Sequence, residues 1–167
     1  MRVFLGLAVP VLAAIIQVTV VRFVAVGEVR PDVLVLAVIS WSLAAGAAEG
    51  IWWAFIAGIA ADLLGSAAFG ATTVSLLPVA LFFGLRGRSA GEPPLAAAAA
   101  LVGLGALAHQ AVQAIVLLLV GTPLPPLTLV LGSAAGVALY TGLLGLVVYP
   151  AVRVLHRRTT REPAFEW

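Results

Sequence analysis

Six apolar stretches alternate with short polar stretches along the chain, and each apolar stretch has the length of a helix. The longer ones run for about 20 residues almost without charge, which is typical of helices that cross a bilayer. We therefore predict an all-α polytopic membrane protein whose six transmembrane helices form one domain, residues 1–152, followed by a short basic cytoplasmic tail, residues 153–167. The predicted spans lie near residues 3–21, 31–48, 50–65, 71–85, 95–120 and 127–149.

The polar connections contain residues that begin or end helices. Pro31 and Asp32 suit the first turn of the second span, because proline tolerates that position and a carboxylate is favourable at the positive end of a helix. Glu49 and Gly50 predict a tight turn, or a break in helix direction, between the second and third spans. The other predicted connections are 65–70, 85–94 and 121–126, and Pro150 is expected to mark the end of the last span.

A stripe of small residues that ends in a carboxylate lies within residues 46–70. Its members recur every four residues, so they share one narrow face of a helix. Small residues let helix backbones approach closely in a membrane, so this face is expected to pack on another helix, either within the protein or on a partner. The helix-packing or partner candidates here are Glu49, Gly50, Ala54, Gly58, Asp62 and Gly70.

The composition supports a membrane location and argues against several kinds of site. The chain is 63% hydrophobic and 10% charged, whereas soluble domains carry about 25% charged residues. The absence of cysteine excludes disulfides and thiolate zinc sites, and two histidines with scattered carboxylates do not predict a metal centre. We predict no cofactor.

All nine basic residues are arginines, and they lie at the ends of the apolar stretches and in the tail. There they indicate membrane orientation, not nucleic-acid binding. With six spans, seven arginines share the side of the two termini and two lie on the other side. The positive-inside rule then predicts that both termini lie in the cytoplasm. The cytoplasmic surface candidates are Arg86, Arg88, Arg157 and Arg158.

Several polar side chains fall well inside the predicted spans, namely a few hydroxyls and Gln17, Asp62, His109, Gln110 and Gln113. Such residues are costly in a bilayer and need a reason to be there. One interpretation is a proton relay or ion site that joins Asp62 to His109, or a polar pocket around the histidine and the glutamines. The interpretation that we favour is structural, with hydrogen bonds between helices and Asp62 bonded to a neighbouring helix or to the loop that follows it.

Motifs of known enzyme classes are missing from the sequence. It contains no nucleophile elbow, phosphate-binding loop, zinc-protease motif or paired catalytic carboxylates. Ser133 with His109 as its base is conceivable, but no third residue in the sequence would orient the pair. We therefore predict a protein that is not an enzyme.

Residues 30–88 contain a series of motifs in a definite order. Pro31-Asp32 opens an apolar span, Glu49-Gly50 follows it, and then come G-x-x-x-D-L-L at 58–64, a small loop at 65–70, and G-x-x-G-R at 84–88. In order and spacing this segment resembles the bacterial rod shape-determining protein MreD family.

The resemblance implies a non-enzymatic membrane subunit of the cell-elongation machinery that synthesises peptidoglycan. It also implies partners: the bitopic protein MreC, the MreB filament, the glycosyltransferase RodA and its class B penicillin-binding protein. The implied fold is similar to the six-helix substrate-binding subunits of energy-coupling-factor transporters.

That fold similarity supplies an alternative function, a small-molecule-binding subunit of a transporter. A binding subunit needs several polar groups that converge on a cavity, whereas the polar set within the spans is small. A scaffold needs close-packing faces, and small residues are plentiful at 46–58, 103–106 and 132–136. We therefore favour a scaffold that binds membrane lipid and an MreC-like partner, and no nucleic acid.

Overall fold

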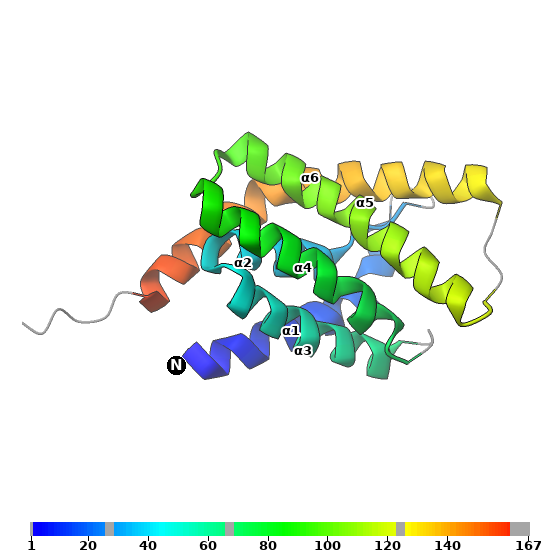
Figure 1. The fold of residues 1–167 in the computed structure, drawn as a ribbon, viewed down its shortest axis with the longest axis horizontal. Coiled ribbons are helices and arrows are strands. Elements are labelled where there is room, and N and C mark those ends of the chain that lie inside the picture. Colours follow the sequence, from blue (N-terminus) through cyan, green and yellow to red (C-terminus); the bar gives the residue numbers. More distant parts are fainter. Residues whose placement is uncertain (1, 26–28, 66–68, 123–125, 161–167) are drawn as a thin grey trace, which may run out of the picture.

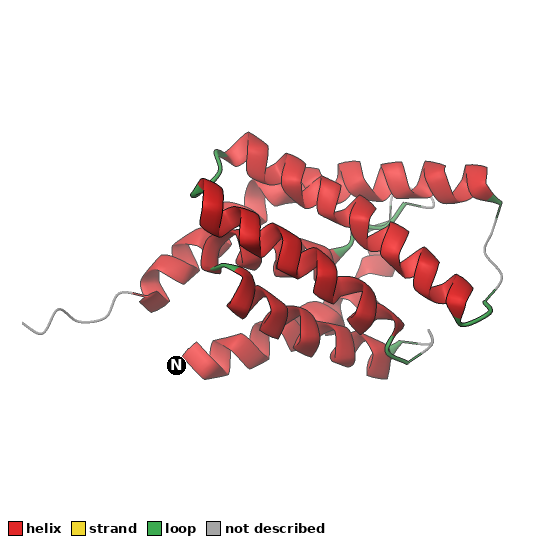
Figure 2. Cartoon of the chain, in the orientation of Figure 1, coloured by secondary structure: helices red, strands yellow, loops and turns green. Residues whose placement is uncertain are grey.

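The computed structural model describes residues 2–25, 29–65, 69–122 and 126–160, and the secondary structure of these residues is helical (Figure 2). The all-α fold class is confirmed. The six α-helices of the described chain follow the order of the six predicted spans. They are α1 (Arg2–Thr19), α2 (Val33–Ala45), α3 (Ala47–Leu64), α4 (Ala71–Ala90), α5 (Leu95–Leu119) and α6 (Leu127–Thr160), with a short 3-10 turn at Val21–Phe23 after α1.

The helices run back and forth between two ends of one bundle (Figure 1). The start of α1, the end of α6 and the α2–α3 and α4–α5 connections lie at one end, which we name the terminal end. The α1–α2, α3–α4 and α5–α6 connections lie at the other, which we name the distal end. Three separate connections are therefore brought together at the distal end, and two connections and both ends of the helical chain are brought together at the terminal end.

Three of the described helices, α3, α5 and α6, are long and apolar enough to cross a membrane. The other three contain shorter apolar segments, at Gly6–Thr19, Val33–Ala45 and Ala71–Gly87. Large apolar side chains cover much of the outer surface, and Leu139 and Val147 on α6 are each 71% exposed. An apolar outer surface of this kind suits a protein that is surrounded by lipid.

Three predicted boundaries are wrong. The chain turns at Gly46, whose φ of +92° suits glycine, so Glu49 and Gly50 lie in the first turn of α3 and form no turn of their own. Helix α4 continues to Ala90 instead of ending near 85, because Gly84 and Gly87 pack closely on the α2–α3 corner. Helix α6 continues through Pro150 to Thr160, where we predicted the tail.

The extension of α6 has a visible cause in its packing. Val152 and Leu155, which lie beyond Pro150, pack against the hydrophobic core. A proline inside a helix removes one backbone hydrogen bond, and apolar burial on both sides of Pro150 offsets that loss. Part of the predicted tail therefore belongs to the helical bundle.

The small-residue stripe of α3 packs inside the protein. A Cβ atom at Gly50 would lie 2.8 Å from Cβ of Ser42 on α2, and one at Gly58 would lie 2.5 Å from Cα of Thr73 on α4. Ala54 between them is fully buried. The stripe thus holds α3 against α2 on one side and α4 on the other, which decides between the two packing alternatives that the sequence left open.

Helices α5 and α6 meet through Gly103, which lies in one of the expected small-residue faces, and through Gly142, which does not. A Cβ atom at Gly103 would lie 2.9 Å from the carbonyl oxygen of Ala138, and one at Gly142 would lie 3.1 Å from that of Ala99. In the predicted pair at 132–136, Gly132 faces open space and Gly136 faces Val29. The first half of α6, at Gly132 and Gly136, therefore does not pack closely on α5.

Replacing Gly58 with alanine tests the α3–α4 contact. In an isolated helix this change is favourable by about 1 kcal/mol. Here the added methyl group must push Thr73 away, and overpacking of this kind costs about 1–3 kcal/mol. Because the methyl group meets backbone atoms of Thr73, the cost should lie in the upper part of that range, at about 2–3 kcal/mol. We therefore expect a net loss of about 1–2 kcal/mol in the free energy of unfolding, measured by SDS-induced unfolding of the purified protein in mild detergent.

Gly6→Ala is the matched control, because its nearest atom would be Trp53 Nε1 at an ordinary contact distance of 3.9 Å. It should leave stability unchanged or slightly raised. If both variants are equally stable, close backbone contact at Gly58 does not hold α3 against α4.

Candidate functional site

The carboxylate of Asp62 caps the helix that follows it. Its Oδ1 accepts a hydrogen bond from Thr72 N at 3.0 Å, and its Oδ2 accepts two from Thr73, from N at 3.0 Å and Oγ1 at 2.7 Å. The residue before α4 is Gly70, with a φ of +89° and no side chain to provide a cap. A carboxylate from α3 therefore satisfies backbone donors that α4 cannot satisfy by itself. This arrangement matches the structural interpretation of Asp62, in which its carboxylate bonds to a neighbouring helix.

A second buried carboxylate, Asp32, joins three helices at the distal end. Its Oδ1 caps α2 by accepting from Val35 N at 3.0 Å, and its Oδ2 lies 2.9 Å from Nδ1 of His109 on α5. Its backbone N–H donates to Oγ1 of Thr141 on α6 at 2.9 Å. Asp32 and His109 are only 8% and 3% exposed. The buried partner of His109 is thus Asp32, and not Asp62 as the relay hypothesis required.

Gln17 connects a further helix to the same place. Its Oε1 accepts a hydrogen bond of 2.7 Å from Val33 N, in the first turn of α2. This is the interhelical role that we favoured for Gln17. Helices α1, α5 and α6 therefore all bond to the beginning of α2.

A polar cavity of about 610 Å³ lies around these groups, and we name it the head cavity. Polar residues from α1, α4 and α5 and from the segment before α2 line it, together with apolar residues such as Leu34 and Val137. Nε2 of His109 is buried and has no hydrogen-bond partner among the described residues. Of the residues named as polar inside the predicted spans, Gln17, His109, Gln110 and Gln113 line the cavity and Asp62 does not. The polar residues of the cavity are Gln17, Arg30, Asp32, Thr72, His109, Gln110 and Gln113.

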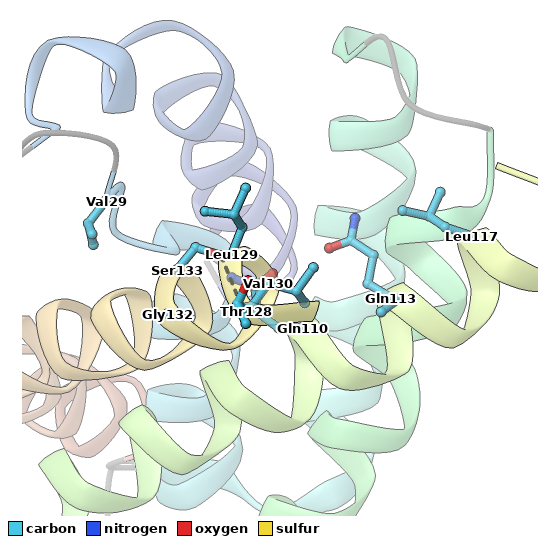
Figure 3. Close-up of a pocket in the computed structure, with 10 residues that line it drawn as sticks. Val29, Gln110, Gln113, Leu117, Thr128, Leu129, Val130, Gly132 and Ser133 are labelled. Carbon is cyan, nitrogen blue, oxygen red and sulfur yellow. Dashed lines mark hydrogen bonds between the residues drawn. The ribbon is translucent and has the colours of Figure 1, made fainter. Parts of the chain in front are cut away.

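A second cavity of about 600 Å³, named here the chain cavity, lies between the distal halves of α5 and α6. The residues labelled in Figure 3 come from both helices: Gln110, Gln113 and Leu117 from α5, and Thr128, Leu129 and Val130 from the start of α6. Apart from the two glutamines, its walls are mostly apolar. Because Gln110 and Gln113 line both cavities, the two adjoin along this face of α5.

The terminal end carries a separate polar cluster. Glu92, in the α4–α5 connection, accepts hydrogen bonds through Oε2 from Arg153 and Arg157, the second at 2.7 Å. Two of the arginines beyond the last predicted span are thus held against the bundle. Of the other cytoplasmic candidates, Arg86 and Arg158 are exposed, and the side chain of Arg88 is outside the described part of the structure.

Aromatic residues pack at the same end. Trp41 stacks on Trp53 with ring centroids 4.1 Å apart, and its Nε1 donates to Oε2 of Glu49 at 3.1 Å. His156 of α6 lies edge-on to Trp41. Glu49, which we predicted as a packing or partner candidate, therefore braces the α2–α3 hairpin from the surface.

The Glu92 cluster predicts a small pH dependence of stability. The hydrogen bonds from Arg153 and Arg157 hold the pKa of the Glu92 carboxyl below its ordinary value. The folded state thus has the lower pKa, so the cluster stabilises the protein above the ordinary glutamate pKa of about 4.3 and loses this contribution as the pH falls through the lowered value.

We expect Glu92→Gln to cost less than about 1 kcal/mol at pH 7, since the pair is partly exposed and screened by water. The difference from the parent protein should narrow as the pH falls below about 4.3. Unfolding midpoints at several pH values measure it, and a difference that does not change with pH would contradict the role given to the charge on Glu92.

The described residues contain no group of three or more histidines and carboxylates that could hold a metal ion. The sequence had revealed which polar residues lie inside the spans, but not the pairing of Asp32 with His109. The sequence offered two hints of this pair, since Asp32 opens one span and His109 is a single histidine within another. These residues are 77 positions apart, and no sequence spacing joins them.

Packed helices with an apolar outer surface, and buried polar groups that bond across helix interfaces, define an α-helical integral membrane protein. The chain belongs to a known family of such proteins. The family described as rod shape-determining protein MreD matches residues 1–158, so the resemblance seen in residues 30–88 is confirmed and covers nearly the whole chain. Comparisons with curated proteins and with solved structures gave no match. Family membership assigns the protein a role in rod-shape determination.

Proposed function

We propose that this protein is a non-enzymatic scaffold of the cell-elongation machinery, with six transmembrane helices in the plasma membrane. One observation carries the proposal. The two buried carboxylates, Asp32 and Asp62, are both used to cap helices and to join them to their neighbours. Carboxylates that cap and join helices make the helical bundle rigid. A family member that acts in rod-shape determination without catalysis needs a rigid surface to which other proteins can bind.

The partner that we propose is an MreC-like protein with a single membrane helix, alongside RodA, a class B penicillin-binding protein and the MreB filament. The exposed arginines Arg86 and Arg158 at the terminal end suit contacts with cytoplasmic partners. The arginine count supports placing this end in the cytoplasm. The fold supports the same assignment, because it brings both ends of the described chain and the α4–α5 connection to one end of the bundle (Figure 1).

Co-purification with site-specific photocrosslinking tests the scaffold. A photoreactive residue is placed on the outer face of three helices, at Trp52, Leu104 and Leu139, all of which are exposed. We expect one of these faces to crosslink to the single helix of an MreC-like protein when the two are co-expressed. If the partner does not co-purify and no position crosslinks, the scaffold proposal fails.

A reporter fused after Trp167 tests the orientation. We expect a cytoplasmic reporter to be active at this position and a periplasmic reporter to be inactive. The opposite result would reverse the proposed topology, whatever the outcome of the co-purification.

The head cavity supports a second candidate, the substrate-binding subunit of a transporter. Such a subunit has to release a bound solute, so the purified protein would retain a water-soluble metabolite and would co-purify with transporter subunits. These two results together, without an MreC-like partner, would favour it over the scaffold.

A further inference from the structure

The head cavity and the chain cavity adjoin at the distal end and differ in chemistry. The first is lined by a histidine, a carboxylate, a hydroxyl, a guanidinium and three amides, and the second mainly by aliphatic side chains. Their shared wall is the face of α5 that carries Gln110 and Gln113. A polar space that continues into an apolar one matches the shape of an amphiphile with a head and a chain.

The head cavity contains polar groups that the fold does not use. Nε2 of His109 has no partner among the described residues although the side chain is buried. Because a carboxylate can only accept, Asp32 places the proton of a neutral His109 ring on Nδ1 and leaves Nε2 as an acceptor. A buried acceptor without a donor is costly, so this nitrogen calls for a ligand that donates, such as a hydroxyl group.

The glutamines and the arginine define the rest of the ligand. The side chains of Gln110 and Gln113 make no hydrogen bond to another described residue, and an amide can both donate to and accept from hydroxyls. In Figure 3 the Gln113 amide points away from α5. Arg30 also lines the head cavity, is exposed, and forms no ion pair with a described residue, so it provides a positive charge for an anion.

We propose that the distal end binds an anionic lipid with a hydroxyl-bearing head group, whose head occupies the head cavity and whose chain enters the chain cavity. The hydroxyls meet His109 and the two glutamines, the anionic group meets Arg30, and the first part of the chain lies between α5 and α6. The chain cavity exists because Gly132 and Gly136 do not close on α5. A water-soluble ligand with the same head would leave this apolar space unfilled. The proposal is independent of the scaffold partner.

Lipid retention by the full-length purified protein tests this proposal. After detergent exchange, the protein is titrated with phosphatidylglycerol, whose head carries two hydroxyls and a phosphate. Phosphatidylcholine with the same acyl chains and soluble glycerol phosphate are titrated in parallel, and native mass spectrometry counts the bound molecules. We expect one phosphatidylglycerol per protein at an at least tenfold lower concentration than phosphatidylcholine, and weaker binding of glycerol phosphate.

Three variants locate the site without disturbing the Asp32–His109 pair. Gln113→Leu removes an amide and Arg30→Gln removes the rim charge, and each should reduce the preference for phosphatidylglycerol at least threefold. Gly132→Phe fills the chain cavity and should weaken the binding of both phosphatidylglycerol and phosphatidylcholine. Leu139→Phe, on the exposed face of α6 and outside both cavities, is the matched control and should leave the binding of both lipids unchanged.

Arg30 is exposed, so its variant tests the proposal even if Gln113→Leu unfolds. Equal retention of the two lipids, or a preference that none of the three variants changes, would overturn the site. Binding of glycerol phosphate as tight as that of the lipid would overturn the role of the chain and favour a soluble anion. None of these results affects co-purification with an MreC-like partner, so the two proposals fail separately.

Discussion

Replacing His109 with leucine is expected to lower the free energy of unfolding by about 3 kcal/mol, because a hydrogen bond to a charged group contributes about 1.5–3 kcal/mol and the loss is largest when the carboxylate is buried. The leucine leaves Oδ2 of Asp32 without its hydrogen-bond partner in a site where the aspartate is only 8% exposed. The backbone N–H of Asp32 donates to Thr141 and its Oδ1 accepts from Val35 N, so a carboxylate that turned toward another partner would break the N-cap of α2. SDS-induced unfolding in mild detergent measures the loss.

A double-mutant cycle separates this effect from simple repacking. Asp32→Asn keeps a good N-cap for α2, since asparagine caps a helix about as well as aspartate, and it removes the negative charge to which His109 donates its hydrogen bond. The Asp32→Asn/His109→Leu double variant should therefore be more stable than His109→Leu alone. If the two single variants change the free energy of unfolding by amounts that simply add in the double variant, Asp32 and His109 are not coupled. A loss below about 1 kcal/mol for His109→Leu would show that Asp32 finds another hydrogen-bond partner.

The sequence predicted where the helices lie better than where they end. Apolar stretches mark helices in a membrane because lipid excludes polar side chains, and this depends on composition alone. Helix ends depend on contacts between distant segments. Gly84 and Gly87 prolong α4 by packing on the α2–α3 corner, and the core contacts of Val152 and Leu155 carry α6 beyond Pro150. Neither effect leaves a trace in the local sequence.

The same difference applies to the candidate site. The four-residue spacing from Gly50 to Asp62 correctly predicted a packing face, because helical periodicity is a local property. The helices that would meet this face are set by the tertiary fold. The pairing of Asp32 with His109 is likewise set by the tertiary fold, and so is the meeting of Gln17 with the start of α2. Polarity inside a span revealed four of the polar residues of the head cavity, and only the fold showed that they converge with Arg30, Asp32 and Thr72.

Asp62→Ala is expected to destabilise the protein by about 3–4 kcal/mol, since it combines the loss of a helix cap with buried backbone donors that lose their acceptor. Thr72 N and Thr73 N are both affected, and the α3–α4 contact through Gly58 lies beside Thr73. Asp62→Asn keeps one acceptor oxygen and should lose about half as much stability. Thr73→Val removes only the hydroxyl bond and should cost about 1 kcal/mol.

Asp62→Asn also decides between the structural role and the relay, because an amide can cap a helix but cannot carry a proton. If Asp62 only caps α4, Asp62→Asn should restore rod shape in cells that lack the native protein, in proportion to the amount of folded variant in the membrane. A relay predicts the opposite, with normal amounts of folded Asp62→Asn and round cells. Since both carboxylate oxygens already accept from α4, and His109 bonds to Asp32, we expect rod-shaped cells.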